Sequence, residues 1–179
     1  MPDEIWTIGH WTCPREEFLS PLLGEGIELI ADVRAQPGSR RSPQFGRDEL
    51  PGWLEEAGIG YVHLAELGGR RPRQGVDPAV NGGWQNTSFH NYADYGLSQD
   101  YERGVARLEE LARERRTSLL CGEPMPWRCH RSLIASTLVA RGWVVWHLRV
   151  GAKPVRHELG AWGAAPVVDA DGRVTYPAS

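Results

Sequence analysis

The hydrophobic positions of the chain fall into short runs that are separated by segments with helical spacing. A run of roughly four to seven apolar or β-branched residues that stops at glycine or at charged residues is typical of a buried strand. Runs of this kind predict strands at 5–8, 27–33, 60–64, 117–120 and 144–148.

The segments between these runs place apolar residues three or four positions apart, which predicts amphipathic helices. Pro14 suits a first helical turn and Ser98 suits an N-cap, whereas Gly58 and Gly142 suit helix ends. The apolar sides of the predicted helices consist of Phe18, Leu19, Leu22 and Leu23, then Leu50, Trp53, Leu54 and Ala57, then Tyr101, Val105, Leu108 and Ala112, and finally Leu133, Ile134, Thr137 and Leu138.

Two segments do not follow this alternation. No periodicity is evident in 65–96, where Gly, Pro, Asn and aromatic residues dominate, and we expect a long loop or lid there. The C-terminal extension 150–179 contains VVDADGRVTY, in which Asp171-Gly172 is a turn signal. This extension is therefore expected to form a last strand or hairpin.

Strands that alternate with helices predict a single α/β domain over 1–179, with a mostly parallel five-stranded sheet and helices on both faces. In open parallel sheets, ligands bind beyond the carboxyl ends of the strands. His10, the stretch 32–34 and Glu123 all lie at or directly after predicted strand ends. We therefore expect a cleft at this edge of the sheet.

Composition adds expectations about location and partners. The chain has 179 residues, a net charge of −3 and 41% hydrophobic residues. No apolar run approaches the roughly 18 to 20 residues of a membrane span. The N-terminus lacks the basic and apolar regions of a secretory signal. We expect a cytoplasmic protein with no membrane partner.

Charge and cysteine content narrow the chemistry further. Nucleic acid is not an expected partner, because there is no domain-wide basic charge. All basic residues except Lys153 are arginines, which suit bidentate binding of phosphate or carboxylate. The three cysteines are expected to be thiols in a reducing compartment.

The segment CGEPMPWRCHRS, residues 121–132, concentrates reactive side chains between a predicted strand and a predicted helix. Cys129 falls near the first helical turn, where free backbone N–H groups and the helix dipole lower the pKa of a thiol. The neighbouring Arg128 and Arg131 act in the same direction. These features make Cys129 a candidate nucleophile or thiolate.

The other candidate residues surround this cysteine in the predicted fold. Glu123, His10 and His130 are candidates for catalytic proton transfer. Arg34, Arg131 and Arg128 are candidates for binding an anion, and Asp32 is expected to orient an arginine.

Other interpretations of the same residues stay open. Cys129 could be a small packing residue, with Arg131 merely pairing with Asp32. Cys121, Cys129 and His130 could bind zinc, with Cys13 or His10 as a further ligand, although adjacent residues such as Cys129 and His130 reach one ion with difficulty. A cysteine-phosphatase loop is disfavoured, since Arg128 comes one position too late after Cys121 for Cys-x5-Arg spacing.

Five motifs together resemble a known family. They are IWTIGH, GIELIADVRAQPGSRR, YVHLAELGGR, NYADY and LLCGEPMPWRCHRSLIASTL, within residues 4–149. In order and spacing the chain is similar to the bacterial domain of unknown function 488 family. The resemblance implies a compact cytoplasmic α/β domain with signature positions at 32–34, at Glu123 and at 129–131, and it implies no substrate. Trp11, the PMPW segment, 71–90 and the tail after 150 depart from the family pattern.

The functional hypothesis is an enzyme acting on a nucleotide-like or phosphorylated small molecule, as a cysteine-dependent hydrolase or transferase. One alternative is a non-catalytic module that binds a nucleotide or a partner protein. Another is a structural zinc-binding protein. No cofactor is predicted under the main hypothesis, and the oligomeric state stays open.

Overall fold

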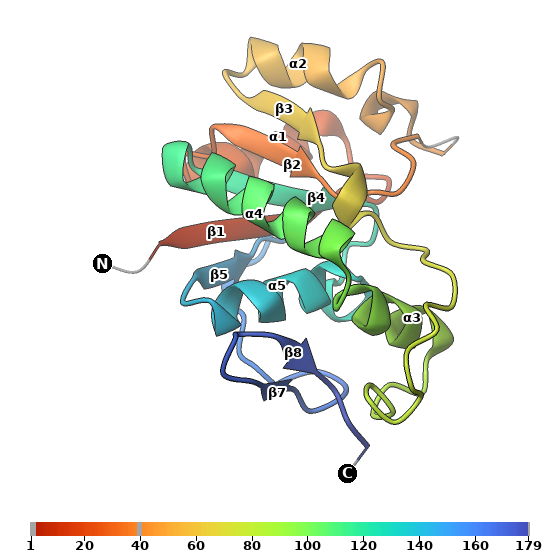
Figure 1. Ribbon diagram of the computed structural model, residues 1–179. Helices are drawn as coiled ribbons and strands as arrows, with labels where there is room; N and C mark the ends of the chain where they lie inside the picture. The colour runs from red at the N-terminus through yellow and green to blue at the C-terminus, as the bar shows by residue number, and fades with distance from the viewer. Residues whose placement is uncertain (1–2, 39–40, 179) are drawn as a thin grey trace.

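The computed structural model describes residues 3–38 and 41–178, and in these residues a six-stranded sheet separates two layers of helices (Figure 1). The strand order is β3-β2-β4-β1-β5-β6. The strands are β1 (Glu4–Gly9), β2 (Leu29–Asp32), β3 (Gly60–His63), β4 (Thr117–Cys121), β5 (Val144–His147) and β6 (Val155–Arg156).

The first five strands are parallel, as the sequence predicted. The predicted second strand begins too early, since β2 starts at Leu29. The sixth strand, β6, pairs antiparallel with β5 and was not predicted. Only two residues long and exposed on both faces, it has no apolar pattern that a sequence could reveal.

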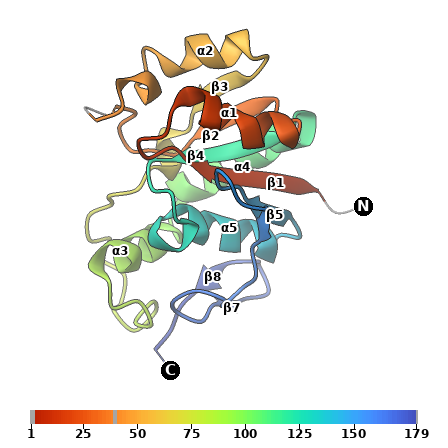
Figure 2. The same ribbon diagram turned by 180° about the vertical axis from the view of Figure 1, so that it is seen from behind.

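The helices lie close to their predicted positions. Figure 2 shows α1 crossing one face of the sheet, whereas α4 and α5 cover the other face in Figure 1. Ser98 caps α4 by accepting a hydrogen bond from the backbone N–H of Tyr101. Leu23, predicted on the apolar side of α1, is 53% exposed. The bounds are α1 (Arg15–Gly24), α2 (Leu50–Glu56), α4 (Gln99–Glu114) and α5 (Arg131–Ala140).

The segment 65–96 is not the continuous loop that we expected. It contains a short 3-10 turn, η2 (Ala65–Leu67), and the helix α3 (Thr87–Tyr95). Asn86 caps α3 by accepting a hydrogen bond from the backbone N–H of Phe89. The polar composition of α3 hides its helical period, because tyrosine, asparagine and aspartate occupy positions that aliphatic residues usually hold.

Each face of the sheet has its own core. Side chains of successive strand residues point to opposite faces, so Ile5 joins the core under α4 and α5 while Trp6 joins the core under α1 and α2. The hairpin β7 (Val167–Val168) and β8 (Val174–Thr175) lies beside α5 (Figure 1), and its turn contains Asp171-Gly172 as predicted. Within the described ranges, no helix combines the length and apolar composition needed to cross a membrane.

The connections leave β1 and β4 toward opposite faces of the sheet, although these two strands are neighbours. Such a switch point is where open parallel sheets usually bind ligands. Here the two strand ends stay tightly joined, because His10 N donates to Cys121 O (3.0 Å) and Trp11 N donates to Gly122 O (2.9 Å). A Cβ atom at Gly9 would collide with the carbonyl of Glu123. The backbones that follow β1 and β4 therefore lie in close contact at the switch point.

Candidate functional site

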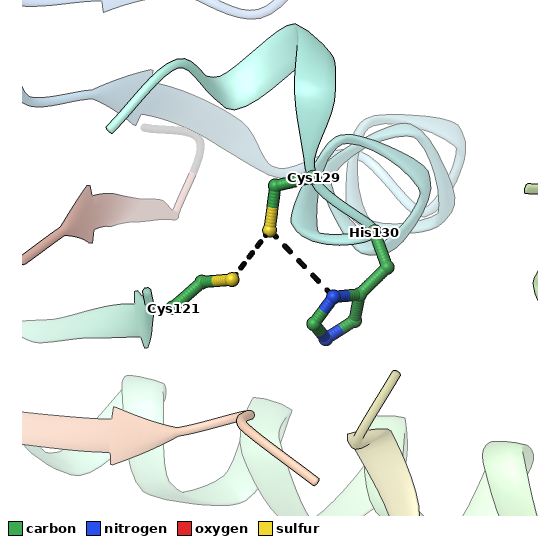
Figure 3. A group of neighbouring side chains, drawn as sticks. All are labelled: Cys121, Cys129 and His130. Atoms are coloured by element: carbon green, nitrogen blue, oxygen red, sulfur yellow. Dashed lines mark hydrogen bonds between the residues drawn. The ribbon is translucent and has the colours of Figure 1, made fainter. Parts of the chain in front are cut away.

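Cys121 and Cys129 lie side by side at the carboxyl edge of the sheet (Figure 3). Cys121 is the last residue of β4, and Cys129 follows the 3-10 turn η3 (Pro126–Arg128) and precedes α5. The Sγ–H of Cys129 donates to Cys121 Sγ at 2.6 Å. The segment 122–128 thus turns back so that residues eight positions apart share one hydrogen bond.

The pKa values of the two thiols are shifted in opposite directions. The hydrogen bond from Cys129 is the main cause that holds the pKa of Cys121 well below its usual value, and the nearby positive charge of Arg131 contributes. Burial raises the pKa of Cys129 well above its usual value. We expected the helix N-terminus to lower the pKa of Cys129, and the backbone N–H of Arg131 does donate to its Sγ (3.4 Å). The effect of burial on the pKa is larger and has the opposite sign. The thiolate of this pair therefore belongs on Cys121.

The imidazole of His130 has a defined orientation beside the two sulfurs. Its Nε2 lies 2.8 Å from the carbonyl oxygen of Val33, which can only accept, so Nε2 carries the proton. Its Nδ1 then presents a lone pair toward Cys129 Sγ, 3.6 Å away. Tyr92 packs edge-on against the ring and Gly69 lies directly over it, where a Cβ would come within 2.9 Å of Nδ1.

The same three side chains have the donor set of a soft-metal site. The Sγ atoms of Cys121 and Cys129 and a ring nitrogen of His130 lie within 4.8 Å of one another. Thiolate and imidazole donors suit zinc, and a second hydrogen bond that orients the imidazole is usual for metal-bound histidine. The expectation that Cys129 and His130 reach one ion with difficulty is not supported by this geometry.

Arg34, Asp32 and His10 form a second cluster beside the first. Asp32 accepts from Arg34 Nε (2.9 Å) and from Arg34 Nη2 (2.7 Å), and the hydroxyl of Tyr61 also donates to it. Arg34 Nη1 reaches the carbonyl of Phe45 and His10 Nε2. The Arg34 side chain is held by these two bonds to Asp32 and is 7% exposed, so it has little surface for an external anion.

His10 links the two clusters electrostatically rather than by a direct bond to sulfur. Its Nδ1 lies 2.7 Å from the carbonyl of Trp11, which fixes the proton on Nδ1 and leaves Nε2 to accept from Arg34. Burial lowers the pKa of His10, while Cys121 is close enough to act in the opposite direction. Both ring nitrogens are occupied, so His130 is the better placed proton carrier.

Arg131 lies inside the protein rather than at its surface. Its side chain is 0% exposed and donates to the carbonyls of Glu123 (2.6 Å) and Pro124 (3.2 Å) and to Thr7 Oγ1 (3.2 Å). It is thus neither an open anion clamp nor the partner of Asp32. Its charge contributes to lowering the pKa of Cys121.

The last two predicted residues are more accessible. Glu123 is half-buried and its carboxylate accepts from the backbone N–H of Met125 (3.3 Å). Arg128 is exposed on η3, next to Cys129. Of the three predicted anion-binding arginines, Arg128 alone presents its guanidinium to solvent.

A buried hydrogen-bonded chain extends away from Arg131 and was not predicted from the sequence. Thr7 Oγ1 lies 2.6 Å from His147 Nδ1, and His147 Nε2 lies 2.9 Å from His157 Nδ1. His157 Nε2 in turn lies 2.9 Å from Ser136 Oγ. Burial lowers the pKa of His147 to about 2 and that of His157 to about 4. The signal in the sequence was that His147 lies next to the end of the strand predicted at 144–148.

Fold and site together define an α/β protein whose parallel sheet carries two cysteines and an imidazole at its carboxyl edge. Residues 14–138 match the family described as domain of unknown function DUF488, which is well over half of the 179-residue chain. The chain therefore belongs to this family, as its motifs indicated. No curated protein and no solved structure matches the chain significantly.

Proposed function

We propose that this chain is a cysteine-dependent hydrolase or transferase that acts on a small anionic or phosphorylated molecule, with Cys121 as its reactive sulfur. The observation that carries the proposal is the hydrogen bond from Cys129 Sγ–H to Cys121 Sγ. A thiolate is the nucleophilic form of cysteine, and a neighbouring donor stabilises it. This assignment moves the nucleophile from Cys129 to Cys121.

The neighbours of Cys121 supply the proton transfers that such a reaction needs. Attack by Cys121 forms a bond from sulfur to carbon or phosphorus while the bond to the leaving group breaks. The leaving group takes the proton of Cys129. Water, or a second acceptor, then displaces Cys121, and its proton returns to Cys129 through the free Nδ1 of His130.

The proposed substrate charge rests on the arginines around the site. Arg128 is exposed on the turn next to Cys129 and is the residue assigned to direct contact with the anion. Arg131 lies beneath the turn with its donors occupied, and contributes positive potential rather than a hydrogen bond. A phosphate or carboxylate on the substrate matches this arrangement.

Alkylation with iodoacetamide across pH tests the nucleophile, with the modified cysteine identified by peptide mass mapping. Cys121 is expected to react with a midpoint below about pH 8.5, the ordinary cysteine pKa. Cys129→Ala removes the hydrogen-bond donor and raises this midpoint, whereas Cys13→Ser leaves it unchanged because Cys13 lies in the core under α1. A Cys121 that reacts only after unfolding would overturn the proposal.

A non-catalytic binding module would behave differently. Phosphorylated small molecules would then raise the melting temperature, because binding to the native state alone stabilises it. The shift would be the same in wild type and in Cys121→Ser, and no ligand would be turned over. Turnover that is lost in Cys121→Ser and retained in Cys13→Ser favours the enzyme.

Zinc binding is the second candidate, and the convergence of two sulfurs and the oriented His130 favours it. These three residues would hold the ion, with a fourth position left for water or another ligand. Elemental analysis of protein purified without chelator would then give one zinc per chain, and Cys129→Ala or His130→Ala would lose it. Protein that remains metal-free and equally stable after incubation with zinc would exclude this candidate.

A further inference from the structure

Cys121 and Cys129 are arranged for a reaction with each other as well as with a substrate. Their sulfurs are 2.6 Å apart, and they come from two different parts of the chain, the end of β4 and the residue directly after η3. Figure 3 shows the Sγ of Cys129 between Cys121 and the His130 ring. Cys13 belongs to the core on the opposite face of the sheet, with Phe18 and Phe45. The chain thus contains one adjacent thiol pair and one separate thiol.

We propose that this pair is a peroxide-reactive dithiol that closes to a Cys121–Cys129 disulfide, and that closure switches off the nucleophile. The second half of this statement rests on the proposed function. The first half rests on the position of the two sulfurs alone, since a disulfide forms fastest when a second thiol is already adjacent to the oxidised one.

The chemistry takes place in two balanced steps. The thiolate of Cys121 attacks one oxygen of a hydroperoxide, so that an S–O bond forms, the O–O bond breaks and an alcohol or water leaves with a proton taken from solvent. Cys129 sulfur then attacks the sulfenic sulfur, so that the S–S bond forms and the hydroxyl leaves as water with the Cys129 proton. Two thiols are oxidised by two electrons and the hydroperoxide is reduced by two.

The low exposure of the two cysteines favours a small oxidant. Cys121 is 8% exposed and Cys129 is 5% exposed, with η3 and the His130 ring beside them. A small oxidant reaches sulfurs that are so little exposed most readily, and hydrogen peroxide is therefore the probe of choice. The Nδ1 lone pair of His130 can accept the Cys129 proton as the second bond forms.

The test uses the full chain carrying Cys13→Ser, which leaves only the two thiols of the pair. One equivalent of hydrogen peroxide is expected to link the peptides that contain Cys121 and Cys129, with a loss of about 2 Da that dithiothreitol reverses. Thiol loss should be at least about tenfold faster than at Cys13 in the Cys121→Ser/Cys129→Ser variant. Unchanged thiols, or equal rates in both variants, would overturn the inference.

A second variant keeps the test decisive if the double variant folds poorly. Cys129→Ser removes the resolving thiol, so peroxide treatment should leave a sulfenic acid on Cys121 that dimedone captures. Absence of that adduct on folded protein would also count against the proposal. Alkylation of the reduced chain separates the two ideas: Cys121 that alkylates readily but forms no disulfide overturns only the redox switch, and a disulfide without ready alkylation overturns only the nucleophile.

Discussion

Arg131 occupies an environment that guanidinium groups rarely enter. It is 0% exposed, and its hydrogen-bond acceptors are two backbone carbonyls and the hydroxyl of Thr7. A buried cation needs all of its donors satisfied, because desolvation costs several kcal/mol. The turn at Glu123 and Pro124 needs the same bonds, since its carbonyls face the protein interior. Arg131 therefore holds the loop between β4 and α5, and with it the position of Cys129.

Replacing Arg131 by methionine is expected to destabilise the fold by about 3 kcal/mol, because it leaves buried carbonyls without donors. The free energy of unfolding in urea measures this change. The exposed neighbour Arg128 is the matched control, and Arg128→Met should stay within about 0.5 kcal/mol of wild type. Equal effects of the two substitutions would contradict the structural role of Arg131.

At the scale of elements, the histidine pair joins three parts of the chain. His147 ends β5, His157 follows the edge strand β6, and Ser136 lies on α5. Trp162 packs against both imidazole rings. The C-terminal segment thus contacts the sheet through groups that are buried in the neutral form, and its attachment must depend on pH.

Acidification is expected to weaken the fold through His157. Burial lowers its folded pKa to about 4 from an ordinary 6.5, so its stabilising contribution is complete above pH 6.5 and is lost as the pH falls toward 4. At pH 5 the loss amounts to about 2 kcal/mol from this residue. Urea unfolding at pH 7.5 and pH 5 measures it, with His157→Asn as the comparison.

The His157→Asn variant lacks one titrating group, so its unfolding free energy should fall less between the two pH values than that of wild type. Carboxylates titrate in both proteins and cancel in the difference. Identical pH slopes would show that His157 is accessible to protons in the folded state.

At the scale of the whole molecule, the sheet separates two hydrophobic cores that consist of different residues. Ile8 packs on the face covered by α1 and α2, and Ile134 packs on the face covered by α4 and α5. Both side chains are 0% exposed. Ile8 and Ile134 belong to separate hydrophobic clusters, so we expect the effects of substitutions at these two positions to be independent.

Ile8→Val and Ile134→Val are each expected to cost about 0.5–1.5 kcal/mol, the range for removal of one buried methylene. The double variant should lose the sum of the two to within about 0.5 kcal/mol. The free energies of unfolding of wild type, the two single variants and the double variant, measured by chemical denaturation, complete this double-mutant cycle. A coupling energy clearly above that bound would mean that the strands transmit packing changes from one face to the other.

The sequence predicted most of the fold because buried parallel strands leave a clear signal. In β4 every residue is buried, and the apolar run in the sequence was visible for that reason. The cap at Ser98 and the turn at Asp171-Gly172 were equally readable. Elements without an apolar pattern were missed, as α3 and β6 demonstrate.

The sequence predicted which residues gather at the site but not what each of them does there. Parallel topology brings His10, Asp32 and Cys121 to one edge, and this follows from strand ends alone. Which cysteine has the lower pKa depends on the direction of one hydrogen bond and on burial, which no spacing encodes. Arg34 and Arg131 were expected to face a ligand, but the interior uses their donors.

The carbonyl oxygen of Glu123 lies against Gly9 and belongs to a chain of contacts that reaches His147. The carbonyl of Glu123, which leaves no room for a side chain at position 9, also accepts from Arg131, and Arg131 in turn touches Thr7 and through it His147. An added methyl group at Gly9 would push on this carbonyl, loosen the guanidinium behind it and disturb a histidine near the other edge of the sheet. A change beside the sulfur pair would thus reach the contacts that His147 makes with His157 and Trp162 in the C-terminal segment.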